Sequence, residues 1–308
     1  MQLSTVLEVV LALSFLFATL SLVASGANEM ISAALGLRAR TLKKGIANLL
    51  SGEAESERKV VVDALYGHPL IASLYRKGRL PSYIPKQKFA LALIDEKIKP
   101  AVGAGANAVA AIPGLIDGLP DGQLKASLDV LWRDANDDVG QFRRNVEGWF
   151  DDSMERVSGW YRRLAQIILG VLGVVLAVGL NVNAATVAQQ LWRDAPLRAA
   201  VVKQAEQPQP PTEQADSPTE QADSPTLTES AKEVEAGLKA VDSLSLPIGW
   251  DDGFDPDLAS VPGWLFTAIA ISMGAPFWFD LLGRVARLRS TGVRTQTAVP
   301  DSAETEKK

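Results

Sequence analysis

Few residues in this sequence are of a type that supports catalysis. Among its 308 residues there is no cysteine and one histidine, His68. The chain therefore has no thiol nucleophile, no thiolate metal ligand and no set of histidines for a zinc site. His68 precedes Pro69, which favours a turn, and a lone histidine there most often packs through hydrogen bonds. We expect neither enzyme activity nor a bound cofactor or metal.

Acidic residues also cluster, but their spacing does not fit a metal site. The four carboxylates of residues 251–257 have the order D-D-G-F-D-P-D, which matches no calcium-binding loop that we can define. For this group, oxygen ligation of Ca²⁺ stays an alternative. The acids between residues 134 and 155 lack the loop and the glycine of an EF-hand. We interpret this second group as the solvated face of a helix.

Polar residues inside apolar stretches are the better functional candidates, because burying polar groups in lipid is costly. Glu8, Asn181 and Asn183 are expected toward the outer ends of two apolar helices, where they would form an intramembrane polar cluster. Such a cluster either joins helices by hydrogen bonds, which we favour, or lines a path for an ion or solute. Asp280 and Arg284, four residues apart near the inner end of a third stretch, are expected to pair.

The elements that must carry these residues are long apolar helices. A bilayer core of about 30 Å needs roughly 20 mainly apolar helical residues. Three regions meet this requirement, and we predict membrane helices over residues 1–27, 164–188 and 262–282. For the first, a cleaved signal peptide is the alternative. The length of its apolar run, and the absence of Lys and Arg before that run, favour a retained helix.

The second and third stretches contain residues typical of packed membrane helices. Another helix can approach the second stretch closely at three glycines, Gly170, Gly173 and Gly179. Trp264 and Trp278 lie toward opposite ends of the third stretch, as interfacial aromatic residues often do. Pro276 is predicted to kink or locally open this helix.

Residues 28–163 are predicted to form a helical domain between the first two spans. Its first part is amphipathic, with apolar residues at helical spacing and basic residues on the other face. We expect this basic face to contact anionic lipid headgroups, and packing against the rest of the domain is the alternative. The basic residues concerned are Arg38, Arg40, Lys43 and Lys44.

Residues 189–261 have a different composition. They include two identical copies of PTEQADS between residues 211 and 224, and a segment so rich in Pro, Gln, Ser, Thr and acids cannot bury a core. We predict an acidic, partly disordered loop with one short helix around residues 228–244. A basic tail, residues 283–308, follows the third span.

The distribution of Lys and Arg predicts the orientation. Residues 28–163 contain 20 Lys and Arg against 17 Asp and Glu, whereas residues 189–261 contain 5 against 14. The basic residues that flank the three stretches all fall on one side of a three-span arrangement. That side should be the cytoplasm, so the N-terminus and residues 189–261 are expected outside and the C-terminus inside.

Three short stretches resemble an uncharacterised family of bacterial integral membrane proteins. They are ERVSGWYRR before the second span, LPIGW before the third and GAPFWFDLLGR at its end. With the first span they cover roughly a third of the chain. No activity is known for that family, so the resemblance implies a membrane topology and no mechanism.

The sequence therefore predicts an all-α protein of the bacterial inner membrane, with three transmembrane helices and a helical cytoplasmic domain. We expect a scaffold or partner-binding protein that contacts membrane lipids, further copies of itself, or other membrane or cytoplasmic proteins. Nucleic acid is not an expected partner, because the net charge is -5 and no basic stripe is present. The alternative is a subunit of an oligomeric channel or transporter.

Overall fold

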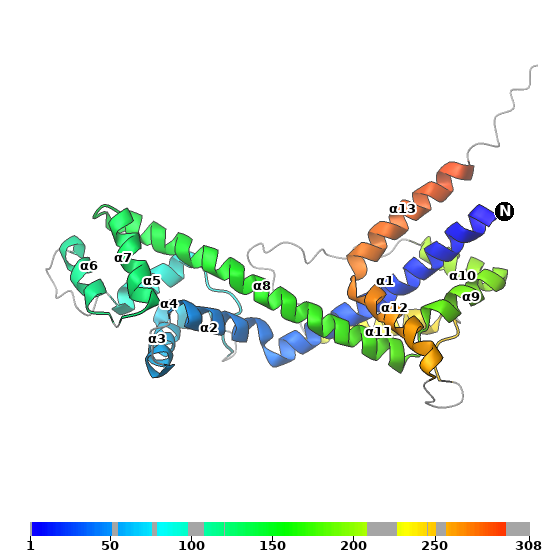
Figure 1. Ribbon diagram of the computed structural model, residues 1–308, viewed down its shortest axis with the longest axis horizontal. Coiled ribbons are helices and arrows are strands. Elements are labelled where there is room, and N and C mark those ends of the chain that lie inside the picture. The colour runs from blue at the N-terminus through cyan, green and yellow to red at the C-terminus, as the bar shows by residue number, and fades with distance from the viewer. Residues whose placement is uncertain are drawn as a thin grey trace, which may run out of the picture. The chain divides into compact units, whose positions relative to one another are not determined.

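The computed structural model describes the chain in segments. They are residues 2–50, 55–75, 79–97, 108–119, 121–207, 227–244, 246–250 and 257–293. The described residues are mainly helical and contain no strand, as the sequence predicts (Figure 1). Both the apolar stretches and the domain between the first two of them form helices.

The helices are unequal in length. Two of them are much longer than the rest, α1 with 34 residues and α8 with 41. The first half of the chain contains α1 (Gln2–Leu35), α2 (Leu37–Leu49), α3 (Glu55–Gly67), α4 (Pro69–Ala72), α5 (Lys86–Lys97), α6 (Ala108–Asp117), α7 (Gln123–Asp134) and α8 (Val139–Gly179). The remainder contains α9 (Ala184–Arg193), α10 (Ala195–Ala205), α11 (Leu227–Asp242), η2 (Leu258–Ser260), α12 (Val261–Ser272) and α13 (Ala275–Val293).

The chain divides into two compact units. Unit 1 comprises residues 1–31 and 165–308, and unit 2 comprises Ser32–Leu164. Helices α1 and α8 each contribute residues to both units. At about 1.5 Å per residue, α8 is roughly 60 Å long, twice the thickness of a hydrocarbon core. Its second half alone is apolar enough for lipid.

Unit 2 has a hydrophobic core of its own, formed by α2 to α7 and the first half of α8. Phe89 of α5 stacks on Phe150 of α8 with ring centroids 3.9 Å apart. Helix α2 lies close against α8, because a Cβ atom on Gly45 would overlap the side chain of Val157. The chain turns from α1 into α2 at Gly36, whose φ of 60° is one that glycine adopts without strain.

Unit 1 is built around α1. The most apolar window of α1 is 67% buried inside the protein, whereas that of α8 is 11% buried. The core that surrounds α1 takes residues from α9, α10, α11, α12 and α13. Two apolar helices therefore have different surroundings, since protein covers the apolar part of α1 and leaves that of α8 exposed.

Two described helices are long and apolar enough to cross a membrane, or three if a bent pair is one span. The first is Ser4–Leu35 and the second Val139–Gly179. The third predicted stretch is not one straight helix: α12 with η2 and α13 meet at an angle of 93° (Figure 1). These features are consistent with a membrane protein, and a third crossing depends on how the bent pair is inserted.

Two further expectations differ from the structure. The helix predicted over residues 164–188 ends at Gly179, because Asn181 has a positive φ of 48° and Asn183 then begins α9. Residues 189–261 contain α10 and half of α9 as well as the expected helix α11. The two PTEQADS copies lie outside the described residues.

Candidate functional site

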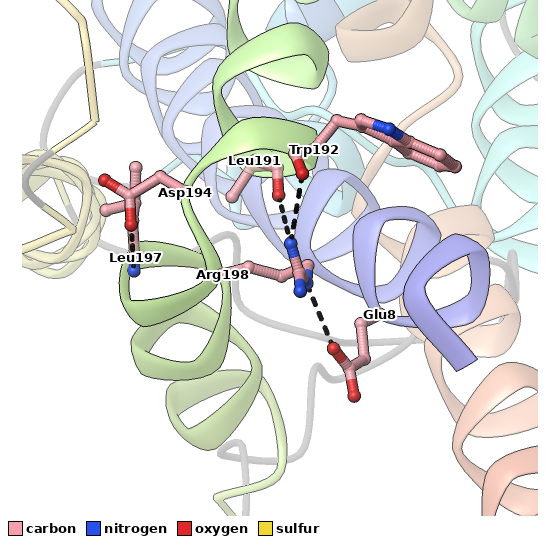
Figure 2. A network of polar contacts seen from close by, with 6 residues as sticks. All are labelled: Glu8, Leu191, Trp192, Asp194, Leu197 and Arg198. Carbon is pink, nitrogen blue, oxygen red and sulfur yellow. Dashed lines mark hydrogen bonds and ion pairs between the residues drawn. The ribbon is translucent and has the colours of Figure 1, made fainter. Parts of the chain in front are cut away.

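Glu8, the one charged residue of the first apolar stretch, forms an ion pair with Arg198 of α10. The Nε of Arg198 lies 3.0 Å from Oε2 of Glu8. The side chains are 11% exposed for Arg198 and 26% for Glu8, so both are largely removed from solvent. Figure 2 shows Arg198 reaching from α10 toward Glu8 on α1. The pair neutralises two charges that would each be costly alone in an apolar surrounding.

The same guanidinium also binds the end of α9. Its Nη1 donates to the carbonyl oxygens of Leu191 at 2.8 Å and Trp192 at 3.4 Å. Asp194, between the two helices, accepts a hydrogen bond from the backbone N–H of Leu197 and so caps α10 (Figure 2). Arg198 therefore connects α1, the last turn of α9 and α10.

Sequence reasoning missed Arg198, because it assigned this residue to an outward loop. The one available signal was Glu8 itself, since an acid within an apolar helix normally has a basic or hydrogen-bonding partner. That rule predicts the kind of partner but not its position, 190 residues further along the chain.

Asn181 lies at the turn after α8 and holds the segment that leads into α12. Its side-chain amide donates to the carbonyl of Gly249 at 2.9 Å and its oxygen accepts from the indole N–H of Trp264 at 3.0 Å. The indole N–H of Trp250 donates to the carbonyl of Val178, at the end of α8, at 3.0 Å. The end of α8 and the turn after it thus hold both tryptophans through hydrogen bonds, and Asn181 contacts Gly249 and Trp264 at once.

Asn183 has a separate role as the N-cap of α9. Its side-chain oxygen accepts from the backbone N–H groups of Ala185 and Thr186 at 3.0 and 3.3 Å. Its amide nitrogen lies 3.4 Å from the carbonyl of Ser260. A Cβ atom at Gly263 would overlap this amide, so only glycine allows α12 to pass so closely.

The three polar residues thus have separate functions. The hydrogen-bonding groups of Asn181 and Asn183 are used at the junction between α8 and α12, and Glu8 pairs with Arg198. All the partners described here are groups of the chain itself. This arrangement favours joining of helices over the lining of a path by these side chains.

The break between α12 and α13 is held by side chains that satisfy its carbonyl oxygens. Gly274 adopts a φ of 85°, and the chain turns there. Ser21 of α1 donates to the carbonyl of Ile271 at 3.1 Å, and the indole N–H of Trp278 donates to Ala270 at 2.7 Å. Backbone groups at membrane depth need such partners, because lipid offers none.

Three residues that the sequence singles out, Pro276, Asp280 and Arg284, lie in α13 after the break. Pro276 occupies the first turn of α13, where a missing N–H is tolerated. Asp280 and Arg284 form an ion pair of 2.6 Å along α13, and both side chains are more than half exposed. Pairs of this kind contribute about 0–1 kcal/mol.

The four predicted headgroup residues fall into two groups in unit 2. Arg38 donates to the hydroxyl of Tyr161 at 3.1 Å, and Lys43 lies 3.1 Å from Asp63, so both make contacts within the unit. The other two, Arg40 and Lys44, are exposed. Two of the four basic side chains of α2 therefore pack within unit 2, and the other two are exposed to solvent.

Two buried titratable residues of unit 2, His68 and Tyr66, take part in its packing. Nδ1 of His68 accepts from the backbone N–H of Leu70, so the ring proton is on Nε2, which lies 3.2 Å from Asp95. Both ring nitrogens are thus used in holding α4 and α5. Burial, with a smaller contribution from Tyr75, raises the pKa of Tyr66, so this phenol stays protonated at neutral pH.

Two of the acids between residues 134 and 155 have structural roles, one as a helix cap and one in an ion pair. Asp138 caps α8, and the backbone N–H groups of Gln141 and Gly140 lower the pKa of its carboxyl. Asp151 pairs with Lys86 at 2.6 Å and raises the pKa of that lysine. No group of three or more His, Cys, Asp or Glu that could hold a metal occurs among the described residues. Residues 251–256 lie outside that part of the chain.

Comparisons with known proteins give no match. No known protein family matches the sequence, and neither curated proteins nor solved structures contain a similar chain. The resemblance to an uncharacterised membrane family therefore stays a prediction.

Proposed function

We propose that this chain is a non-enzymatic integral membrane protein that serves as a scaffold, binding partners through unit 2. The observation that carries the proposal is the contrast between the units. Unit 1 exposes the apolar side chains of α8 and α12, whereas unit 2 encloses a separate core beneath a polar surface. A membrane anchor attached to a folded helical domain, whose described residues include no group of acids and histidine that could hold a metal, is suited to binding partners.

Unit 2 also offers apolar surface to a partner. Val60, Leu70, Leu91 and Val130 are large apolar residues with between 36% and 68% of their surface exposed. Large apolar side chains exposed on a folded domain are a common feature of protein interfaces. Lys and Arg are more numerous in this unit than on the 189–261 segment, which favours the cytoplasmic side of a bacterial inner membrane for unit 2.

Photo-crosslinking in cells tests the scaffold. A photoreactive amino acid replaces Leu70 or Leu91 in the full chain, and a matched control replaces Arg133, which lies in an exposed surface ion pair with Asp129. We expect crosslinks to protein from the two apolar positions and few from the control. No protein crosslink from either position, together with a strictly monomeric chain in mild detergent, would contradict the proposal.

A subunit of an oligomeric channel or transporter is the second candidate. The observation that favours it is the 93° break between α12 and α13, because transporters and channels use interrupted helices at membrane depth. The chain has too few spans to enclose a path alone, so copies would have to assemble. Purified protein in liposomes should then raise ion flux above that of empty liposomes, and unchanged flux would remove this candidate.

A further inference from the structure

Helix α11 lies directly against the apolar part of α1. A Cβ atom on Gly237 of α11 would overlap the side chain of Val23, and one on Gly26 of α1 would lie 3.0 Å from Val234. The backbone oxygen of Thr19 is also next to Gly237, at 3.8 Å from that Cβ position. The two helices therefore run antiparallel in close contact over residues 19–26, within the first apolar stretch.

At the level of residues 19–26 of α1, unit 1 also has a side that exposes apolar side chains, formed by α8. Ser21, between Thr19 and Val23, donates to the carbonyl of Ile271 in α12. Helix α12 in turn contacts α8, where a Cβ on Gly173 would lie 2.8 Å from the oxygen of Ala268. Around Gly173, α8 exposes a series of aliphatic side chains, Ile167, Val171, Val174 and Val175. Helix α11 and this lipid-compatible face of α8 thus occupy a similar depth.

The outer face of α11 is charged at that depth. Lys232, Glu235, Lys239 and Asp242 are all exposed, and Glu233, whose side chain is also exposed, lies at the edge of the contact with Gly26. Glu235 and Lys239 form an ion pair of 2.6 Å in which each side chain is about two-thirds or more exposed. The hydrogen bond from Lys239 lowers the pKa of Glu235, so this carboxyl stays ionised at neutral pH. A face with this many charges is very costly to place in hydrocarbon.

Chain continuity gives an independent argument. The side chain of Gln204, at the end of α10, lies 3.3 Å from Ser243, just after α11. The first turns of α11 lie at the opposite end of this helix, next to Gly26 of α1, because Ser230 and Val234 both approach that glycine. Helix α11 has 16 residues and is about 24 Å long. The sequence that links α10 to α11 contains the polar PTEQADS copies, a composition unsuited to hydrocarbon.

From these observations we propose that unit 1 has a lipid side, formed by α8 and α12, and a water side at the same depth, formed by α11. The ligands of the water side are water and small hydrophilic solutes. This inference rests on the proposed insertion of unit 1 into the membrane. It means that α1 is an internal helix between the two sides, which agrees with its extensive burial.

Thiol labelling tests the two sides, since the chain has no native cysteine. Lys232→Cys and Ala236→Cys probe exposed positions on α11, and Val171→Cys and Val174→Cys probe exposed positions on α8. Ser217→Cys is a reference in a polar sequence. Each full-length variant is labelled with a membrane-impermeant maleimide in sheared membranes, so that the reagent reaches both membrane surfaces. Labelling in denaturant verifies that each thiol is present.

We expect both α11 positions to react within about tenfold of the Ser217 variant, and both α8 positions to react at least about tenfold more slowly than α11. The reason is that maleimide needs water and an accessible thiolate, and neither is present in hydrocarbon. If α11 is as unreactive as α8, the water side is wrong while membrane insertion stands. If the α8 positions react as fast as the reference, membrane insertion itself is wrong, and the inference with it.

Discussion

The pair between Glu8 and Arg198 gives the sharpest test of the fold of unit 1. Glu8→Gln keeps an oxygen acceptor but removes the charge, and Arg198→Met keeps the length of the side chain but removes every donor. Breaking a fully buried pair costs about 3–5 kcal/mol, whereas an exposed pair contributes about 0–1 kcal/mol. With side chains 11% and 26% exposed, this pair lies nearer the buried case.

The two substitutions should differ in size because Arg198 has additional partners. We expect Glu8→Gln to lower the free energy of unfolding by about 1.5–3 kcal/mol, the value of one hydrogen bond to a charged group, because the amide keeps an acceptor but leaves the guanidinium charge unpaired. Arg198→Met also removes the bonds to the carbonyls of Leu191 and Trp192, so about 2–4 kcal/mol is expected. The double variant should lose less than the sum, by about 1–2 kcal/mol, because no unpaired charge remains.

Thermal unfolding in one detergent, followed by the helical circular dichroism signal, measures these effects. For a chain of this size, each kcal/mol corresponds to a shift in Tm of about 2–4 °C. Asp280→Asn is the matched control, because it breaks a carboxylate–arginine pair in the same unit whose side chains are 60% and 68% exposed. Equal shifts for Glu8→Gln and Asp280→Asn, or strictly additive effects in the double variant, would refute the reasoning.

Three further predictions concern other contacts. Gly173→Ala should lower Tm by several degrees, since overpacking costs about 1–3 kcal/mol and the new Cβ would press on backbone, whereas Gly170→Ala, with open space beside it, should not lower Tm. Trp278→Phe removes the indole donor to the carbonyl at the helix break and should speed amide exchange there, and unchanged exchange would contradict that role. Asp138 has a lowered pKa in the folded chain, so its cap stabilises α8 above the ordinary pKa of aspartate and is lost as pH falls through the lowered value. Asp138→Asn keeps the cap and should flatten this part of the acid unfolding curve, which a pH titration of helix content measures.

The sequence alone predicts the features that depend on local pattern. Apolar residues at helical spacing predict an all-helical chain, and the structure confirms this class. Pro276 predicts an interruption of the third stretch, which occurs next to it at Gly274. In each case the information lies within a few residues of the feature.

Other features depend on partners that are distant in the sequence. High hydropathy is compatible both with enclosure by protein and with exposure to lipid, so it did not predict that α1 is 67% buried and α8 only 11% buried. Nothing near Glu8 in the sequence indicates Arg198, because a charge is neutralised by any suitable group that the fold brings to it. The end of the second helix was also misjudged, since apolar residues continue past Asn183, which caps a new helix.

The chain's sequence therefore determined its helical class, its apolar stretches and the position of the break, since these follow from the residues in each segment. Only the tertiary structure decided which side of each helix is covered. The packing of the charged helix α11 against Val23 and Thr19 is the clearest case, because α11 by itself is typical of any soluble amphipathic helix. Two glycines, Gly26 and Gly237, allow that contact because neither has a side chain to separate the helices. The sequence does not indicate this role, because it does not show which surface each glycine faces.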